Sequence, residues 1–224
     1  MIEGHTSKAF DGELAALHIH VIQMGGLVLD QVREAAAAYA EWDTGIAAHV
    51  IERERTVNAY EYEIDAEQFG LIARRAPVAG DLRAIVAMAK SIAELERAGD
   101  EAKKIALTVS RHAARPGHAT AGDARHLGQL AVSLLRLSLE AFDAVDATRA
   151  AEVIARDEEL DTEYAAGMRR LLTRAMEDPR HFDVTLEAAF VLKSLERIGD
   201  HARNVARHLL KIFPLEPLPR HATA

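Results

Sequence analysis

Two pairs of carboxylates with the same spacing could do chemistry in this chain of 224 residues. Glu96 and Asp100 lie four residues apart, and Glu196 and Asp200 repeat the pair later in the chain. Residues at this spacing share one face of a helix, where two like charges cost about 0.2–0.5 kcal/mol. A neighbouring basic side chain could offset this repulsion, and so could a hard cation, which prefers several carboxylate oxygens. The pairs are therefore candidates both for a metal site and for ordinary solvated helix faces.

The two pairs belong to an internal repeat. Residues 95–106 match residues 195–206 at seven of twelve positions and share the motif Leu-Glu-Arg-x-Gly-Asp. A second, weaker match relates residues 50–58 to residues 153–161. Similarity at a constant offset indicates an internal duplication. It reduces the weight of the solvated-face interpretation, because the same acidic register occurs twice.

The second match adds acidic residues that could complete each site. Glu54 and Asp157 occupy equivalent positions, and Asn58 and Asp161 follow one turn later. If the middle and third helices of each half pack side by side, these side chains complete an oxygen-rich site in each half. A set of about four carboxylates suits Mg, Mn or Fe better than Zn or Cu.

Apolar residues at helical spacing occur along almost the whole chain, and no segment alternates as a strand does. Turn residues divide this pattern into six long helices, near 11–40, 45–75, 79–112, 123–145, 147–177 and 181–213. The sequence therefore predicts an all-α fold of two pseudo-symmetric, antiparallel three-helix bundles. Residues 1–115 form the first repeat and residues 116–214 the second. The proline-rich residues 215–224 are expected to be a flexible tail.

The helical wheel predicts where the first acidic pair points. One stripe of the third helix is apolar and consists of Leu95, Ala98, Ala102 and Ile105. Glu96 and Asp100 lie nearly opposite, so we expect them to face solvent, a ligand or another subunit. Glycine inside a helix costs about 0.5–1 kcal/mol relative to alanine. Gly99 and Gly199 therefore suggest that a neighbour packs close to the backbone beside both pairs.

Composition excludes several classes of function. The net charge of −8 disfavours binding to nucleic acid. The absence of cysteine excludes disulfides and thiolate metal sites. No run approaches 18 apolar residues and the N-terminus does not resemble a signal peptide, so the cytoplasm is the expected location. Neither a His-Glu-x-x-His motif nor a phosphate-binding glycine loop occurs. A metal-dependent enzyme, such as a di-metal oxidase or a phosphohydrolase, is thus a weaker alternative, as is a metal-free structural bundle.

The repeated motif resembles the PhoU family of phosphate-transport regulators. The resemblance extends over essentially the whole chain and is strongest at residues 92–100 and 194–200, with further matches at Met24-Gly25-Gly26 and Asp81-Leu82-Arg83. It implies surface metal clusters held by Glu96, Asp100, Glu196 and Asp200, with Asp157 and Asp161 at acidic positions of the second bundle. Glu54 stands where relatives often carry Asp, which keeps the charge but lengthens the side chain.

The resemblance also implies a biological role. Members of this family are adaptors without a catalytic step that link the phosphate ABC transporter, through its ATPase subunit, to a sensor histidine kinase. They keep the phosphate-starvation response off and restrain uptake when phosphate is plentiful. The resemblance further implies a homodimer that reaches the membrane only through its partners.

Overall fold

The computed structural model describes residues 8–113, 121–178, 180 and 182–213. It confirms the predicted all-α fold of six helices, with every helix end within three residues of the predicted one. The helices are α1 (Lys8–Glu41), α2 (Thr44–Arg75), α3 (Ala79–Arg111), α4 (Ala121–Asp143), α5 (Ala147–Glu177) and α6 (Phe182–Leu210). The predicted boundary between the repeats at residue 115 and the predicted tail, residues 215–224, lie outside the described residues.

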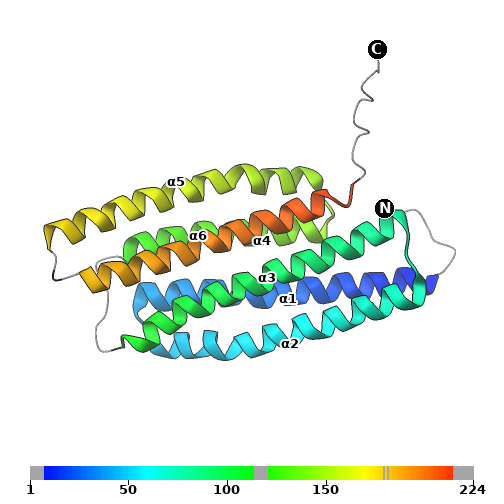
Figure 1. Ribbon diagram of the computed structural model, residues 1–224, viewed down its shortest axis with the longest axis horizontal. Coiled ribbons are helices and arrows are strands. Elements are labelled where there is room, and N and C mark those ends of the chain that lie inside the picture. Colours follow the sequence, from blue (N-terminus) through cyan, green and yellow to red (C-terminus); the bar gives the residue numbers. More distant parts are fainter. Residues whose placement is uncertain (1–7, 114–120, 179, 181, 214–224) are drawn as a thin grey trace, which may run out of the picture.

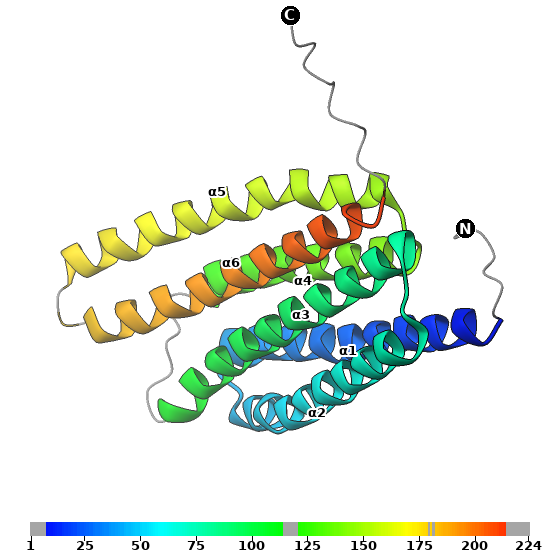
Figure 2. The ribbon, with the colours of Figure 1, turned by 45° about the vertical axis from the view of Figure 1, so that its right-hand side comes forward.

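The helices form two three-helix bundles that lie side by side (Figure 1). Helices α1, α2 and α3 pack against one another in the first bundle, and α4, α5 and α6 do so in the second. The bundles meet where α3 packs on α6 and where α1 packs on α4. Helices α2 and α5 therefore lie on the outer sides of the molecule, as the turned view also shows (Figure 2).

The turns between the first and second helices of each half are built alike. Asp43 precedes α2 and Asp146 precedes α5, and each carboxylate accepts hydrogen bonds of 2.8–3.1 Å from two backbone N–H groups of the helix that follows. These bonds satisfy donors that have no partner within the helix. Trp42 and Val145, one residue earlier, both have a positive φ. The duplication therefore extends to the turn geometry.

The predicted apolar stripes form the core. Every residue of the α3 stripe is fully buried, as are their counterparts on α6. By length and composition, α1 is also the one helix among the described residues that could cross a membrane. Core helices of folded domains pass the same test, and α1 packs against α2, α3 and α4 with Leu17, Val21, Met24 and Val28 buried. These contacts give α1 the role of a core helix.

The contact between the two bundles depends on a small residue in α4. A Cβ atom added at Gly128 would lie 2.7 Å from Cβ of Ala36 in α1, which is fixed to its helix and cannot rotate away. We expect Gly128→Ala to lower the free energy of unfolding by about 1–3 kcal/mol, because overpacking forces backbone shifts. Gly26→Ala is the control, since no atom lies within 4 Å of its added Cβ. That change should stabilise α1 by up to about 1 kcal/mol. Urea denaturation measures both, and equal effects would contradict the prediction.

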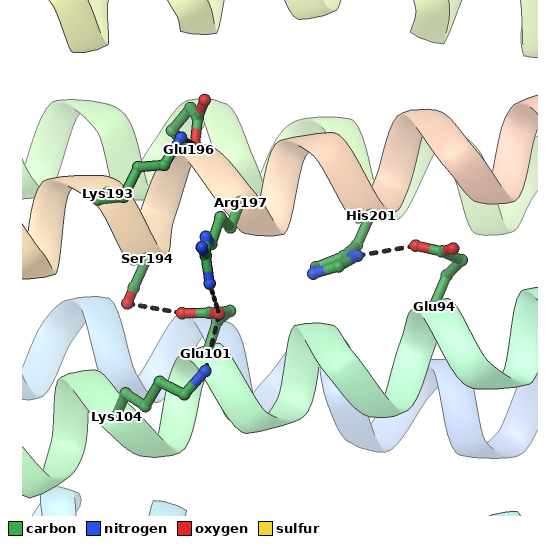
Figure 3. A network of polar contacts seen from close by, with 8 residues as sticks. All are labelled: Glu94, Glu101, Lys104, Lys193, Ser194, Glu196, Arg197 and His201. Carbon is green, nitrogen blue, oxygen red and sulfur yellow. Dashed lines mark hydrogen bonds and ion pairs between the residues drawn. The ribbon is translucent and has the colours of Figure 1, made fainter.

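A buried polar network joins α3 to α6 at the interface between the two bundles (Figure 3). Glu101 accepts hydrogen bonds from Ser194 at 2.7 Å and from Arg197 at 3.1 Å. Glu94 pairs with His201 at 2.7 Å. Positions 94 and 194 are equivalent in the repeat, as are positions 101 and 201. The two contacts are therefore related by the pseudo-symmetry of the duplicated chain.

Hydrogen bonds keep both carboxylates of this network ionised. Burial alone would raise the pKa of Glu94, but hydrogen bonds from His201 and Asn204 outweigh burial and lower it. The pKa of Glu101 is also lowered, because Lys104, Ser194 and Arg197 outweigh burial. A carboxylate with a depressed pKa in the folded state stabilises the fold above its unfolded-state pKa. That contribution is lost as the pH falls through the folded-state value.

Removing Glu101 tests the strength of this network. We expect Glu101→Ala to lower the free energy of unfolding by about 2–4 kcal/mol, because the Ser194 hydroxyl and the Arg197 guanidinium lose a charged partner. Glu140→Ala is the control, since this exposed carboxylate pairs with Arg136 at 3.1 Å and such pairs contribute about 0–1 kcal/mol. Thermal denaturation at neutral pH compares the two. A loss no larger than that of the control would show that the network contributes little.

Candidate metal centre

Three carboxylates converge between α2 and α3 in the first bundle. Glu54 on α2 and the pair Glu96 and Asp100 on α3 each offer an oxygen, and these oxygens lie within 4.8 Å of one another. The packing of α2 against α3 brings them together. Glu96 and Asp100 are half-buried and point away from their own apolar stripe, as the helical wheel predicts. They face the neighbouring helix α2, which the wheel alone could not show.

Glu54 is the buried member of this group, with only 2% of its surface exposed. Its Oε2 accepts a hydrogen bond of 2.7 Å from Nε2 of Gln31 on α1. Its Oε1 is buried without a hydrogen-bond partner, and the nearest cation is Nζ of Lys103 at 4.0 Å. A buried carboxylate oxygen without a partner is costly. This oxygen, among other carboxylates, is what a hard cation requires, so the residues fit a metal of that class.

The charges in this cluster repel one another. Burial raises the pKa of Glu54, and nearby Asp100 raises it further, against the opposing effects of Gln31 and Lys103. Burial also raises the pKa of Glu96, as do the charges of Asp100 and Glu61. The pKa of Glu61 is raised in the same way by burial, Asp65, Asp100 and Glu54. A bound cation would reverse this destabilisation of the ionised carboxylates.

The equivalent position in the second half holds an arginine side chain. Arg203 on α6 pairs with both Asp157 on α5 and Asp200 on its own helix. Nζ of Lys193 lies 2.5 Å from Glu196. Asp157 is 3% exposed, and its pKa is raised by burial in spite of Arg203. Asp157 and Asp200 thus share one cationic partner of the chain itself, and Glu196 has another.

The other predicted features have different outcomes. Asn58 and Asp161, one turn beyond Glu54 and Asp157, are exposed. The interpretation of the glycines is confirmed in both halves. A Cβ atom at Gly99 would lie 3.3 Å from Oε2 of Glu54, and one at Gly199 would overlap Cδ2 of Leu160.

Four neighbours of the two acidic groups were not among the predicted residues. Glu61 follows Glu54 by seven residues, which is two helical turns, and this spacing could have indicated it. Lys103 and Arg203 follow Asp100 and Asp200 by three residues, where a basic side chain can reach back. Gln31 lies on α1, and no spacing rule connects it to the acidic motif.

The fold and the carboxylate cluster together define an internally duplicated helical-bundle protein with a candidate metal centre in its first half. The family model described as the PhoU domain matches residues 21–109 and again residues 124–209. The chain therefore belongs to the PhoU family, and the two matched segments correspond to the two bundles.

Relatives support this assignment over nearly the full length of the chain. The phosphate-specific transport system accessory protein PhoU homolog of Pseudomonas putida is 42% identical over 204 residues, which cover 90% of this chain and 79% of that protein. The accessory protein PhoU of Escherichia coli K12 is 36% identical over 205 residues, with coverages of 92% and 85%. The crystal structure of PhoU from Pseudomonas aeruginosa superposes with a TM-score of 0.88 at 39% identity, with coverages of 91% and 98%.

A more distant solved structure has the same architecture. The phosphate transport system regulatory protein PhoU from Streptococcus pneumoniae superposes with a TM-score of 0.84 at 27% identity. The match covers 91% of this chain and 96% of that one. The paired bundles are therefore common to relatives that differ widely in sequence.

Proposed function

We propose that this protein is a metal-binding adaptor without a catalytic step that restrains phosphate uptake. The names of its relatives support the link to phosphate-specific transport, since those proteins are called accessory or regulatory proteins of that system. In this proposal the protein works in the cytoplasm as a homodimer. It connects the ATPase subunit of the phosphate ABC transporter to a sensor histidine kinase, and so keeps the phosphate-starvation response off when phosphate is plentiful.

The convergence of Glu54, Glu96 and Asp100 carries the metal part of the proposal. An all-carboxylate donor set suits Mg, Mn or Fe better than Zn. In the second half, Asp157, Asp161, Glu196 and Asp200 form the equivalent set, and an ion there must displace Arg203 and Lys193. The first half is therefore the primary site. A cation there would neutralise the repelling carboxylates and fix α2 against α3, which stabilises the surface presented to partners.

Metal analysis combined with a reporter of the starvation response tests both parts. The triple variant Glu54→Ala, Glu96→Ala and Asp100→Ala should lose most of the bound metal after gentle purification. In cells with plentiful phosphate it should also release the starvation response, measured as alkaline phosphatase activity. Glu196→Ala with Asp200→Ala should remove less metal, because those carboxylates are already paired with Lys193 and Arg203.

A second triple variant controls for the loss of negative charge. Glu41→Ala, Glu158→Ala and Glu177→Ala remove three exposed carboxylates, and none of them belongs to the acidic clusters of α2–α3 or α5–α6. This variant should keep both the metal and the repression. Unchanged metal content and repression in the first triple variant would refute the metal-dependent mechanism. Full stability of the wild-type protein after chelation would favour a metal-free structural bundle.

A further inference from the structure

A basic cavity of about 340 Å³ lies between the first half of α3 and the end of α6. Aliphatic side chains form its wall, namely Ala79, Leu82, Val86 and Ala87. Four basic side chains line the same cavity, namely Arg83, Lys90, His208 and Lys211. In a chain with a net charge of −8, this concentration of basic groups reverses the local charge. We call this site the basic groove.

The cations of the basic groove are not neutralised within the described part of the chain. There, neither Lys90 nor Lys211 forms an ion pair with a carboxylate, and Nε of Arg83 donates only to the carbonyl oxygen of Ile212, at 3.4 Å. Nζ of Lys211 lies 3.5 Å from Nδ1 of His208.

The pKa of His208, which lines the groove, is affected by the unpaired lysines. Burial lowers the pKa of His208, and the positive charges of Lys211 and Lys90 lower it further, in spite of Glu94 at 3.9 Å. Lys90 and Lys211, which line the groove without a carboxylate partner among the described residues, give it a positive charge that attracts an anionic group.

The internal repeat shows that packing does not require these cations. At the offset of the repeated motif, the positions of Arg83 and Lys90 in α3 correspond to Asp183 and Phe190 in α6. Both helices nevertheless pack in equivalent places in their bundles. The basic side chains therefore distinguish this end of the α3–α6 face from the other end, although the backbone arrangement is repeated.

Exposed apolar side chains surround the cations. Val78, Leu82 and Val86 are 73%, 40% and 42% exposed, on or just before the first turns of α3. A second, largely apolar cavity of about 620 Å³ borders the same stretch of α3 from the side of α1 and α4. A single small oxyanion would leave this apolar surface uncovered. An amphipathic helix with acidic residues along its apolar face would cover it and pair with the lysines.

We propose that the basic groove docks an acidic, amphipathic helical segment of a protein partner. Apolar side chains of that segment enter the cavity between Leu82 and Val86 and the end of α6. Its carboxylates pair with Lys90 and Lys211. The inference rests on the proposed function only in that the partner is a protein. It requires neither a bound metal nor any particular identity of that partner.

Site-specific photo-crosslinking tests this proposal in the native host. Val86→p-benzoylphenylalanine places the crosslinker on the exposed rim of the groove. Mass spectrometry of the adduct then identifies the crosslinked segment of the partner. We expect a segment with net negative charge and apolar residues at helical spacing. The variant Lys90→Glu with Lys211→Glu should reduce the adduct at least about tenfold, because like charges across an interface are strongly unfavourable.

The matched control makes the same change in net charge elsewhere. Arg125→Glu with Arg169→Glu reverses two exposed arginines outside the groove and should leave the adduct unchanged. All four side chains are exposed, so both double variants should keep the wild-type melting temperature. If the glutamates disturb folding, Lys90→Ala with Lys211→Ala serves in their place and should still reduce the adduct several-fold.

Several results would overturn the proposal. One is an adduct on a neutral or basic segment, on phospholipid, or on residues 214–224 of the chain itself. Another is an adduct that is still formed by the variant Lys90→Glu with Lys211→Glu. The absence of any adduct would also overturn it. A melting temperature that rises with millimolar inorganic phosphate, but not in the lysine variant, would assign the groove to a small oxyanion instead. The phosphatase reporter tests the role in phosphate uptake separately, so failure of either proposal can be recognised.

Discussion

Arg203→Ala will lower the free energy of unfolding of the metal-free protein by about 3–5 kcal/mol, the usual cost of removing one partner of a buried ion pair. The Asp157 side chain is 4% exposed, and Arg203 pairs with it and with Asp200. Without the guanidinium, the carboxylates of Asp157 and Asp200 remain close together in a partly buried site. Chemical denaturation in the presence of a chelator measures the loss.

Lys103→Ala is the matched control, because Lys103 occupies the position equivalent to Arg203 in the first half. Its Nζ lies 3.9 Å from Asp100 and 4.0 Å from Glu54, and its side chain is 35% exposed. A long contact of a partly exposed lysine contributes about 0–1 kcal/mol. A similar loss of unfolding free energy in the two variants would show that the ion pairs of Arg203 do not stabilise the second half more than Lys103 stabilises the first.

The same substitution should expose a metal-binding capacity in the second half. With the guanidinium gone, Asp157 and Asp200 resemble the carboxylates of the first half. Added Mn²⁺ should therefore raise the melting temperature of Arg203→Ala more than that of the wild-type protein, since a ligand that binds only the folded state stabilises it. An equal rise in both proteins would contradict the idea that the arginine competes with a cation.

Glu54→Gln will have opposite effects on the metal-free and the metal-bound protein. In the metal-free protein, the change removes a buried charge but keeps an oxygen that can accept the hydrogen bond from Gln31. We expect a gain in stability of about 1–3 kcal/mol at neutral pH. The affinity for the metal should fall by at least about a hundredfold, because even changes outside the ligand set typically cost 10–100-fold. Calorimetric titration with Mn²⁺ and thermal denaturation after chelation measure the two effects.

The stabilisation by Glu54→Gln should depend on pH in a definite direction. The pKa of Glu54 is raised in the folded state above its ordinary value of 4.5. The ionised carboxylate therefore weakens the fold at a pH above the folded-state pKa, and this penalty disappears once both states are protonated. The difference in melting temperature between the variant and the wild type should be largest at neutral pH and should shrink as the pH falls towards 4.5. Gln68, also buried on α2, provides a control position, because Gln68→Glu should show the reverse dependence.

Local spacing was sufficient to predict much of the fold. The helical period, the turn residues and the repeated motif led to six helices in two related bundles. The stripe of Leu95, Ala98, Ala102 and Ile105 was predicted to be buried because a helix with one apolar face must cover it. The motif also indicated Glu96 and Asp100 as a pair, since residues four apart share a face of a helix.

Only the tertiary structure decided which of these carboxylates meet one another and which meet a cation of the chain. Glu54 is brought to Glu96 and Asp100 by the packing of α2 on α3, and Gln31 reaches the same point from α1. The two halves carry nearly the same motif, yet Arg203 forms close ion pairs with Asp157 and Asp200. Lys103, in contrast, remains about 4 Å from Glu54 and Asp100. Spacing along one helix determines which side chains share a face. The relative placement of two helices determines the distances between their charges, and it depends on contacts along their whole length.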